Sequence, residues 1–226
     1  ALPISVNLSD MAAMGAAPKW ATLSVALPQL DEAWVKAFCD SLFALADAHG
    51  LQLVGGDTTR GDWVFNVTIM GQTPQGLGLR RDAAQVGDDV WVSGRLGLAC
   101  AALFDHWNEV HLDDDVFTIC EAARLRPQAR VALGQALLPI AHAAQDVSDG
   151  FAQDLQHILT ASHVGAVVNV DALPTLPELK QYEQWQQWVC AGGDDYELVF
   201  TAPTAAREAI MAAAQATGTA VSMVGK

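Results

Sequence analysis

The chain has 226 residues, of which 51% are hydrophobic, and its formal net charge is −14 at pH 7. This length and composition can bury the core of one large or two small domains. The negative charge argues against a nucleic-acid or anionic-membrane partner, because neither polyanion is attracted to such a surface. No apolar run reaches the length of a membrane-spanning helix and no signal peptide is recognisable, so we expect a cytoplasmic protein without a membrane partner.

The first third of the chain predicts alternating helices and strands. Apolar residues at every second position indicate strands, and apolar residues three or four positions apart indicate helices. Asp31 is typical of a helix N-cap, and Gly50 is typical of the position just after a helix. In chain order we predict a helix at 6–14, a strand at 21–27, a helix between Asp31 and Gly50, a strand at 51–55, a turn at 55–61 and a strand at 63–69.

A segment rich in turn residues follows, from Gly71 to Gly78, and it predicts a domain boundary. The predicted domains are residues 1–76 and 77–226. Within the second domain we predict strands at 89–93, 166–170, 196–200 and 220–224, and helices at 96–104, 116–124, 130–144, 151–162, 176–188 and 204–217. This order of elements indicates a mixed α/β fold.

Four short acidic motifs each place an aspartate at the end of a predicted element. They are Asn7-Leu8-Ser9-Asp10, Gly55-Gly56-Asp57-Thr58, Asp146-Val147-Ser148-Asp149-Gly150 and Gly192-Gly193-Asp194-Asp195. Taken singly, each aspartate has an ordinary structural explanation as a helix cap or a turn residue. Magnesium, however, prefers hard oxygen ligands and usually takes one or two carboxylates per ion, leaving other positions for water and phosphate. Several aspartates on separate elements therefore suggest a site for magnesium and a phosphate-bearing ligand.

The same motifs suit phosphate binding in other ways. Their glycines let backbone N–H groups approach phosphate oxygens, and Ser148 adds a hydroxyl. Arg60, Arg80 and Arg81 could clamp a phosphate, although exposed surface arginines are the simpler explanation. Neither G-x-x-x-x-G-K-[ST] nor an H-R-D catalytic loop occurs, which argues against a P-loop protein and a protein kinase.

Taken together, the motifs resemble those of the thiamine-monophosphate kinases. This family lies in the superfamily of aminoimidazole ribonucleotide synthetase, selenophosphate synthetase and a hydrogenase maturation protein. The resemblance runs along the whole chain, through residues 6–16 with Pro18, 55–61, Arg81 with Gly87-Asp88, Arg126-Pro127, 146–150 and 192–198. The Asn-Leu-Ser-Asp and Gly-Gly-Asp-Thr-Thr forms are similar to this kinase family in particular.

The resemblance implies an α/β (α+β) fold. An N-terminal ferredoxin-like sheet domain that forms a homodimer would be followed by a larger α/β domain. Both domains are expected to be truncated at the chain ends. Family members have an N-terminal segment with Gly-Asp-Asp and Thr-Asp motifs, and a C-terminal portion, that this sequence does not contain. ATP would lie in the cleft between the domains, with thiamine monophosphate beside it.

The resemblance also implies roles for single residues, by their positions in the family motifs. The expected Mg²⁺ ligands are Asp10, Asp57, Asp146 and Asp149, and the expected ATP contacts are Gly56, Asp57, Arg81 and Ser148. Asp194 stands in the place of an acidic residue, often glutamate, that touches the thiamine part of the substrate.

The implied reaction is phosphorylation of thiamine monophosphate to thiamine diphosphate by in-line attack of a substrate phosphate oxygen on the γ-phosphorus of ATP. A phosphate monoester is largely ionised near neutral pH, so no catalytic base is required, and metal electrostatics and positioning supply the rate. Three alternatives stay open here: another ATP-using enzyme of the superfamily, a magnesium-dependent phosphatase, and a non-catalytic nucleotide-binding dimeric scaffold. ADP release that depends on thiamine monophosphate would exclude the phosphatase.

Overall fold

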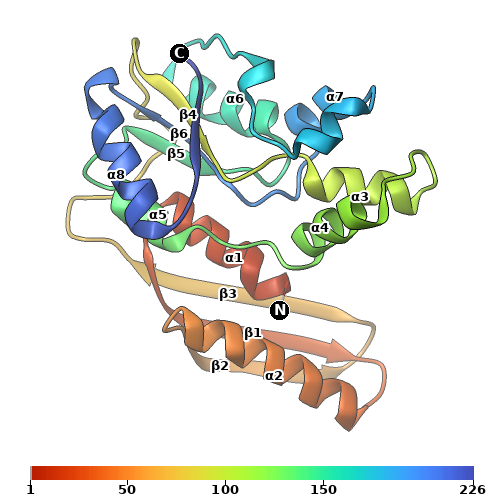
Figure 1. Cartoon of the computed structure of the whole chain (residues 1–226). Coiled ribbons are helices and arrows are strands. Elements are labelled where there is room, and N and C mark those ends of the chain that lie inside the picture. Colours follow the sequence, from red (N-terminus) through yellow and green to blue (C-terminus); the bar gives the residue numbers. More distant parts are fainter. Residues whose placement is uncertain (1) are drawn as a thin grey trace.

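The computed structural model describes residues 2–226 and contains two sheets (Figure 1). The first part of the chain builds a three-stranded sheet with two helices. Its elements are α1 (Leu2–Ala13), β1 (Ala17–Leu27), α2 (Glu32–Ala48), β2 (Gln52–Arg60) and β3 (Val64–Gln72). The strand order is β2-β1-β3, with β1 parallel to β2 and antiparallel to β3. The mixed helix-and-sheet character predicted for this part is confirmed.

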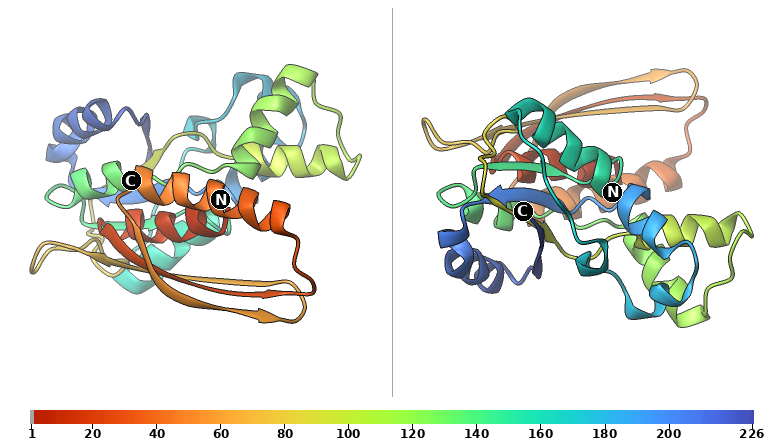
Figure 2. Two further views of the ribbon diagram at one scale, coloured as in Figure 1. Left: turned by 90° about the horizontal axis from the view of Figure 1, so that it is seen from below. Right: turned by 90° about the horizontal axis from the view of Figure 1, so that it is seen from above.

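Helices α1 and α2 lie on one face of this sheet and leave the other face open (Figure 2). Leu23 and Val67 point toward the helices and join the core there. The residues between them along each strand face the opposite way, because side chains alternate. On this open face the strand register places Asp57, Ser24 and Asn66 in one row, and all three are exposed. The open face is therefore polar at its centre and free of any covering element within residues 2–226.

The second part of the chain builds a four-stranded antiparallel sheet in the order β5-β6-β4-β7. Its strands are β4 (Asp89–Ser93), β5 (Ala143–Asp146), β6 (Leu198–Ala202) and β7 (Val221–Gly225). Its α-helices are α3 (Leu98–His106), α4 (Asp114–Leu125), α5 (Val131–Leu137), α6 (Phe151–Ser162), α7 (Trp185–Ala191) and α8 (Arg207–Thr217). Three 3-10 turns lie at Val170–Ala172, Pro177–Gln181 and Thr204–Ala206.

Both faces of the four-stranded sheet are covered. Helices α1, α5 and α8 pack on one face, and α6 and α7 pack on the other. The chain from Leu2 to its end contains no helix that is both long and apolar enough to cross a membrane.

Helix α1 joins the two parts of the molecule. Leu8 and Ala12 are fully buried in a core that includes residues of both sheets. Where α1 meets α5, a Cβ added at Gly134 would lie 2.0 Å from the carbonyl oxygen of Ala12, so this approach requires a residue without a side chain. The close packing fixes the direction in which Asp10 projects from the exposed side of α1.

The strands of the two sheets separate around the predicted domain boundary. β3 ends at Gln72 and β4 begins at Asp89. Because α1 packs against both sheets, the division into residues 1–76 and 77–226 stays a prediction.

Predictions for several single elements are confirmed. The Asp31 carboxylate accepts a hydrogen bond of 3.1 Å from the backbone N–H of Trp34, as expected of an N-cap. The strand predicted at 89–93 and the helix predicted at 151–162 have the predicted bounds. These segments have strong local signals that agree with their tertiary surroundings.

The predicted turn at 55–61 is wrong, because β2 continues to Arg60. Pairing with β1 extends along this whole segment. Gly56 has a φ of 147°, and a Cβ there would lie 1.9 Å from the carbonyl oxygen of Leu23. The glycine therefore permits close strand pairing as well as a turn, and the partner strand decides between them.

Three predictions in the second part are also wrong. The helix predicted at 130–144 ends at Leu137, and the strand β5 follows it. The segment 166–170 forms a single β-bridge, and the helix predicted at 176–188 is a 3-10 turn followed by the short α7. Alanine-rich sequence such as that of β5 favours a helix locally, but pairing with β6 outweighs this preference.

A bidentate ion pair ties the start of α5 to the segment before β6. Arg130 Nε and Nη2 donate hydrogen bonds to the two carboxylate oxygens of Glu197 at 2.7 and 2.5 Å, and the Ser93 hydroxyl donates to the same carboxylate at 2.5 Å. The Glu197 side chain is only 7% exposed. Arg130→Met would leave this buried carboxylate without a counter-charge, so we expect a loss of about 3–5 kcal/mol in the free energy of unfolding, measured by urea titration.

Two variants make this measurement specific. Lys36→Met breaks the Lys36–Asp40 pair, whose side chains are largely exposed, and should change stability little. Adding Glu197→Gln to Arg130→Met removes the unpaired charge and should restore much of the loss. A cost for Arg130→Met as small as that for Lys36→Met would contradict the expectation.

Candidate active site

A cavity of about 790 Å³ opens beside α1, next to the loop that follows β5. We call it the acidic cavity. Its polar lining residues are Asp10, Arg80, Arg81, Asp82, Gln145, Asp146, Ser148, Asp149, Asp154 and His157. Five residues predicted from the sequence as metal or nucleotide ligands therefore meet in one place: Asp10, Arg81, Asp146, Ser148 and Asp149.

Asp146 is the buried carboxylate among these five residues. It is the last residue of β5 and is 7% exposed. Burial, reinforced by the charge of Asp10, raises its pKa to about 6. Burial also raises the pKa of Asp10, and the positive charge of Arg81 partly offsets that effect. Two neighbouring carboxylates whose charged forms are disfavoured in this way favour a cation between or beside them.

The loop that carries Ser148 and Asp149 is held by Asp154, which lies outside the four acidic motifs. One Asp154 oxygen accepts hydrogen bonds from the backbone N–H groups of Asp149 and Gly150 at 3.0 and 3.1 Å. The other accepts one from Gln145 Nε2 at 2.9 Å. An aspartate in the first turn of the helix predicted at 151–162 is the signal that could have found it. Asp154 thus fixes the loop as a rigid part of the cavity wall.

Asp194 lies in a turn that is bonded directly to this loop. The backbone N–H of Asp194 donates to the carbonyl oxygen of Ser148 at 2.8 Å, and that of Tyr196 donates to Val147 at 2.8 Å. Asp194 lines a neighbouring cavity of about 580 Å³. The predicted substrate residue is therefore adjacent to the acidic cavity and not within it.

Gly56 and Asp57 are not brought to the acidic cavity of their own chain. Both lie on β2, and Asp57 is exposed on the open face of the three-stranded sheet. One Asp57 oxygen accepts a hydrogen bond of 2.9 Å from the backbone N–H of the next residue, Thr58. α1, which carries Asp10, covers the opposite face of that sheet.

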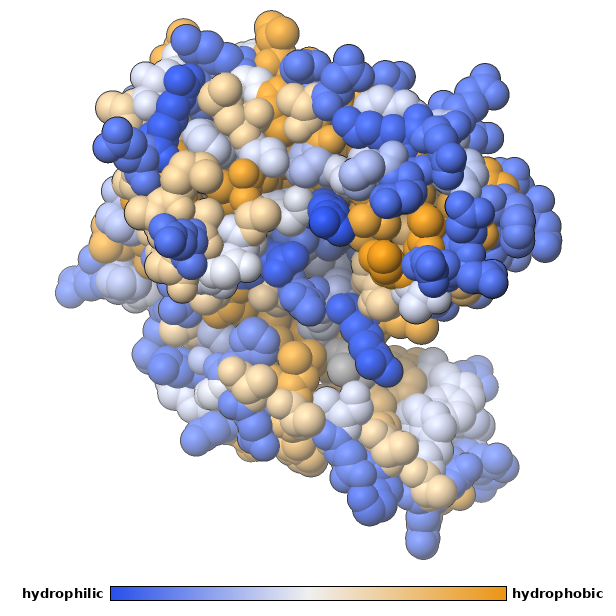
Figure 3. Space-filling view, viewed as in Figure 1, coloured by the Kyte–Doolittle hydropathy of each residue, from blue (hydrophilic) through white to orange (hydrophobic). Residues whose placement is uncertain are grey.

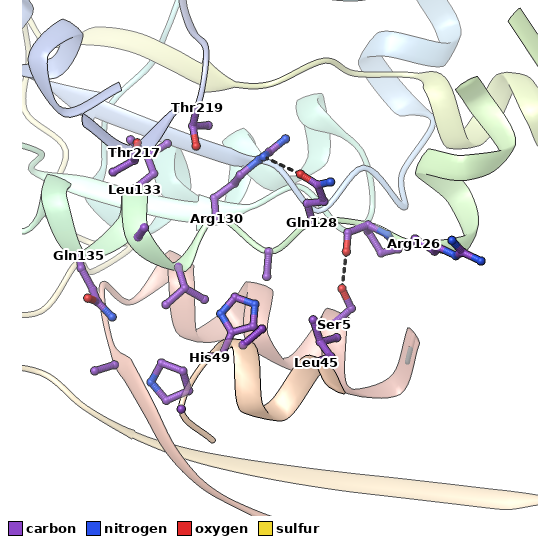
Figure 4. Close-up of a pocket in the computed structure, with 18 of the residues that line it drawn as sticks. Ser5, Leu45, His49, Arg126, Gln128, Arg130, Leu133, Gln135, Thr217 and Thr219 are labelled. Atoms are coloured by element: carbon purple, nitrogen blue, oxygen red, sulfur yellow. Dashed lines mark hydrogen bonds between the residues drawn. The ribbon is translucent and has the colours of Figure 1, made fainter. Parts of the chain in front are cut away.

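A second cavity, of about 990 Å³, lies on the other side of α1 (Figures 3 and 4). Its lining includes Ser5, Lys19, His49, Arg126, Gln128 and Arg130. It holds none of the residues predicted as ligands, and no aspartate or glutamate is among the lining residues that the structure describes. Although it is larger, it lacks the hard oxygen ligands that magnesium requires, so the acidic cavity is the candidate active site.

The acidic cavity fits magnesium only if water and phosphate oxygens complete the coordination shell of the ion. Within residues 2–226, no three side chains of Asp, Glu, His or Cys come close enough together to enclose a metal ion. Magnesium usually takes one or two protein carboxylates and completes its shell with water and phosphate oxygens. Asp10, Asp146 and Asp149 match that pattern, because they line one cavity and leave room for a phosphate ligand.

Two protein-family models match this chain. Residues 1–73 match the family described as AIR synthase related protein, N-terminal domain, and residues 85–226 match the family described as AIR synthase related protein, C-terminal domain. The chain thus belongs to the AIR synthase related proteins.

The curated relatives narrow this class. Thiamine-monophosphate kinase of Salmonella typhimurium is 43% identical over 227 residues, which cover 99% of this chain and 70% of that protein. The kinase of Escherichia coli K12 is 41% identical over 228 residues, with the same coverage. The chain belongs to the thiamine-monophosphate kinase family, as its motifs predict.

Solved structures agree with this assignment. The thiamine-monophosphate kinase from Stenotrophomonas maltophilia K279a superimposes with a TM-score of 0.93 at 44% identity, covering 99% of this chain and 73% of that one. AaThiL complexed with AMPPCP and TMP gives a TM-score of 0.85 at 30% identity, covering 99% and 71%. HypE from E. coli, at 23% identity and a TM-score of 0.81, shares the fold. The predicted fold class is confirmed.

Proposed function

We propose that the protein transfers the γ-phosphoryl group of ATP to thiamine monophosphate and releases thiamine diphosphate and ADP. The observation that carries the proposal is the meeting of Asp10, Arg81, Asp146, Ser148 and Asp149 in one cavity of a chain from this kinase family. The complex of AaThiL with TMP and AMPPCP, an analogue of ATP, supports both substrates. A cytoplasmic location is part of the proposal, because ATP is supplied there.

Each cavity residue has a proposed role. Arg81 and the Ser148 hydroxyl would contact the nucleotide phosphates, and Asp154, by binding the backbone N–H groups of Asp149 and Gly150, would keep the loop that carries Ser148 in place. Asp194, exposed beside the cavity, would face the thiamine part of the substrate.

Magnesium belongs to the proposal as well. Asp10, Asp146 and Asp149 would each contribute carboxylate oxygens, with one or two per ion. When bound, Mg²⁺ supplies electrostatic stabilisation for the charge spread over the transferring phosphoryl group. It also explains how a chain with a net charge of −14 would accept two phosphate-bearing substrates.

The chain's own residues then act by positioning. The substrate phosphate is largely ionised at neutral pH, so its oxygen needs no base residue to attack the γ-phosphorus in line. Arg81 and Ser148 would hold the donor phosphates, and the carboxylates would hold the acceptor through their cations. The reaction would form no phosphorylated side chain.

The test is formation of thiamine diphosphate from ATP and thiamine monophosphate with Mg²⁺, followed by chromatography. ADP should appear only when thiamine monophosphate is present, which separates a kinase from an ATPase or phosphatase. A folded protein that binds ATP but makes no thiamine diphosphate would overturn the proposal.

We propose further that the protein is a homodimer built through the open face of the three-stranded sheet. Trp20, Val64 and Met70 project from this face with 39%, 54% and 42% of their surface exposed. These apolar side chains flank the polar row of Asp57, Ser24 and Asn66, and exposed apolar surface on one face of a sheet is typical of an interaction site. Sedimentation of the wild type should give a dimer mass, and Val64→Asp should shift the mass toward the monomer.

A further inference from the structure

The turn that carries Asp194 is held in a backbone conformation that L-residues avoid. Asp194 and Tyr196 have φ values of 58° and 50°, in the left-handed region. Such values cost roughly 1–2 kcal/mol per residue, and for a bulky aromatic residue they are rare. Strain of this kind persists only where the surroundings hold the backbone, and it often accompanies function.

The surroundings hold this turn on both sides. The backbone N–H groups of Asp194 and Tyr196 donate to the loop at 146–150, as described above. Between them, the Asp195 carboxylate accepts the backbone N–H of Gly97, at the start of α3, at 2.9 and 3.1 Å. The turn is therefore fastened to the cavity loop and to a helix N-terminus, and its conformation is fixed before any ligand binds.

The conformation brings the Tyr196 hydroxyl to the Asp194 carboxylate. The phenol oxygen donates a hydrogen bond to Asp194 Oδ1 at 3.1 Å. Burial, followed by the charges of Asp194, Asp146 and Asp10, raises the pKa of Tyr196. The hydroxyl thus stays a proton donor at neutral pH, and its hydrogen-bond partner is the proposed substrate residue.

We propose that Tyr196 is a positioning residue for thiamine monophosphate. Its hydroxyl holds one oxygen of Asp194 so that the other is presented to the thiamine part of the ligand. This inference rests on the proposed function and adds a residue to it.

The chemistry of the ligand suits this arrangement. Thiamine monophosphate carries a cationic thiazolium ring and an amino group on its pyrimidine ring, and a fixed carboxylate oxygen can pair with either. Aspartate is a short side chain with few rotamers, and a hydroxyl tether removes most of its remaining freedom before binding. Without the tether the carboxylate would rotate, and part of the binding free energy would be spent on ordering it.

The test compares the two tyrosines of the chain. Tyr196→Phe removes the hydroxyl and keeps the ring and the backbone. We expect the Kd and the KM for thiamine monophosphate to rise about tenfold, the size of one lost hydrogen bond to a charged group, while the Kd for ATP stays unchanged. Tyr182→Phe is the matched control, because the Tyr182 hydroxyl donates only to the backbone carbonyl of His111, at 3.1 Å.

A double-mutant cycle separates positioning from direct contact. In an Asp194→Ala background, Tyr196→Phe should have little further effect on the Kd for thiamine monophosphate, because the group that it positions is gone. Additive effects, equal losses for ATP, or an unchanged Kd would overturn the inference. Calorimetric binding of thiamine monophosphate needs no turnover, so the outcome stays distinct from failure of the wild type to make product, which would overturn the proposed function instead.

Discussion

Asp146→Asn is expected to lower the rate of thiamine diphosphate formation at least about a hundredfold. This is the loss seen when an enzyme loses one preorganised group that stabilises charge in the transition state. The substitution keeps the shape of the side chain and removes its charge at the end of β5. Burial and the neighbouring Asp10 both disfavour the charged form of Asp146, so a cation that binds there is expected to pair with this carboxylate. Steady-state assays at saturating ATP and Mg²⁺ measure the loss, and Asp171→Asn, at an exposed position, should keep full activity.

The same variant should not be less stable without magnesium. The Asp146 pKa is raised to about 6 in the folded protein, against about 3.9 in an unfolded chain. The folded state therefore binds more protons between these values, and this group's contribution to stability falls as pH rises from about 4 to 6. In EDTA, wild type and Asp146→Asn should melt similarly near pH 4, and the variant should melt at the higher temperature at pH 7.

Magnesium with ATP should reverse the order of the two melting temperatures at pH 7. A ligand that binds only the folded state raises its melting temperature, so Mg²⁺ with ATP should stabilise the wild type more than the variant. An Asp146→Asn protein that keeps its activity, or one that unfolds more easily at pH 7 in EDTA, would contradict this account of the cavity.

Asp57→Asn is expected to cause a comparable loss of at least about a hundredfold, although Asp57 does not line the acidic cavity of its own chain. Asp57 lies on the open face, and α1 with Asp10 lies on the opposite face. A dimer formed through the open face would bring Asp57 of one subunit toward the other subunit. We therefore expect Asp57 to complete the site of its partner.

Mixed dimers test this directly. Asp57→Asn and Asp146→Asn subunits, each inactive alone, should regain about a quarter of wild-type activity after random exchange, because half of the dimers are mixed and each has one intact site. The control is Asp146→Asn mixed with Asp149→Asn. Both of these changes lie in the acidic cavity of the same chain, so they should give no such recovery. If the first pair exchanges subunits, as mass spectrometry can show, and still stays inactive, Asp57 does not act across the interface.

The sequence by itself predicted the elements whose local signals are complete. The helix after Asp31 has its cap and its terminal glycine within the segment, and the strand at 89–93 and the helix at 151–162 have clear periodicity. The acidic motifs predicted a magnesium and phosphate site, because the chemistry of the ligands depends on residue type and not on the path of the chain. The family followed from the same motifs, and the relatives confirm it.

Tertiary structure decided which of those residues lie together. Asp10 and Asp146 meet because α1 packs between the sheets through the close contact of Ala12 with Gly134, which no local pattern reveals. β5 and the second half of β2 became strands through pairing with neighbours distant in sequence, against their local preferences. Asp57 matches its motif as well as the other aspartates do, yet the register of β2 places it on the opposite side of the sheet, because strand pairing sets the face that each side chain occupies.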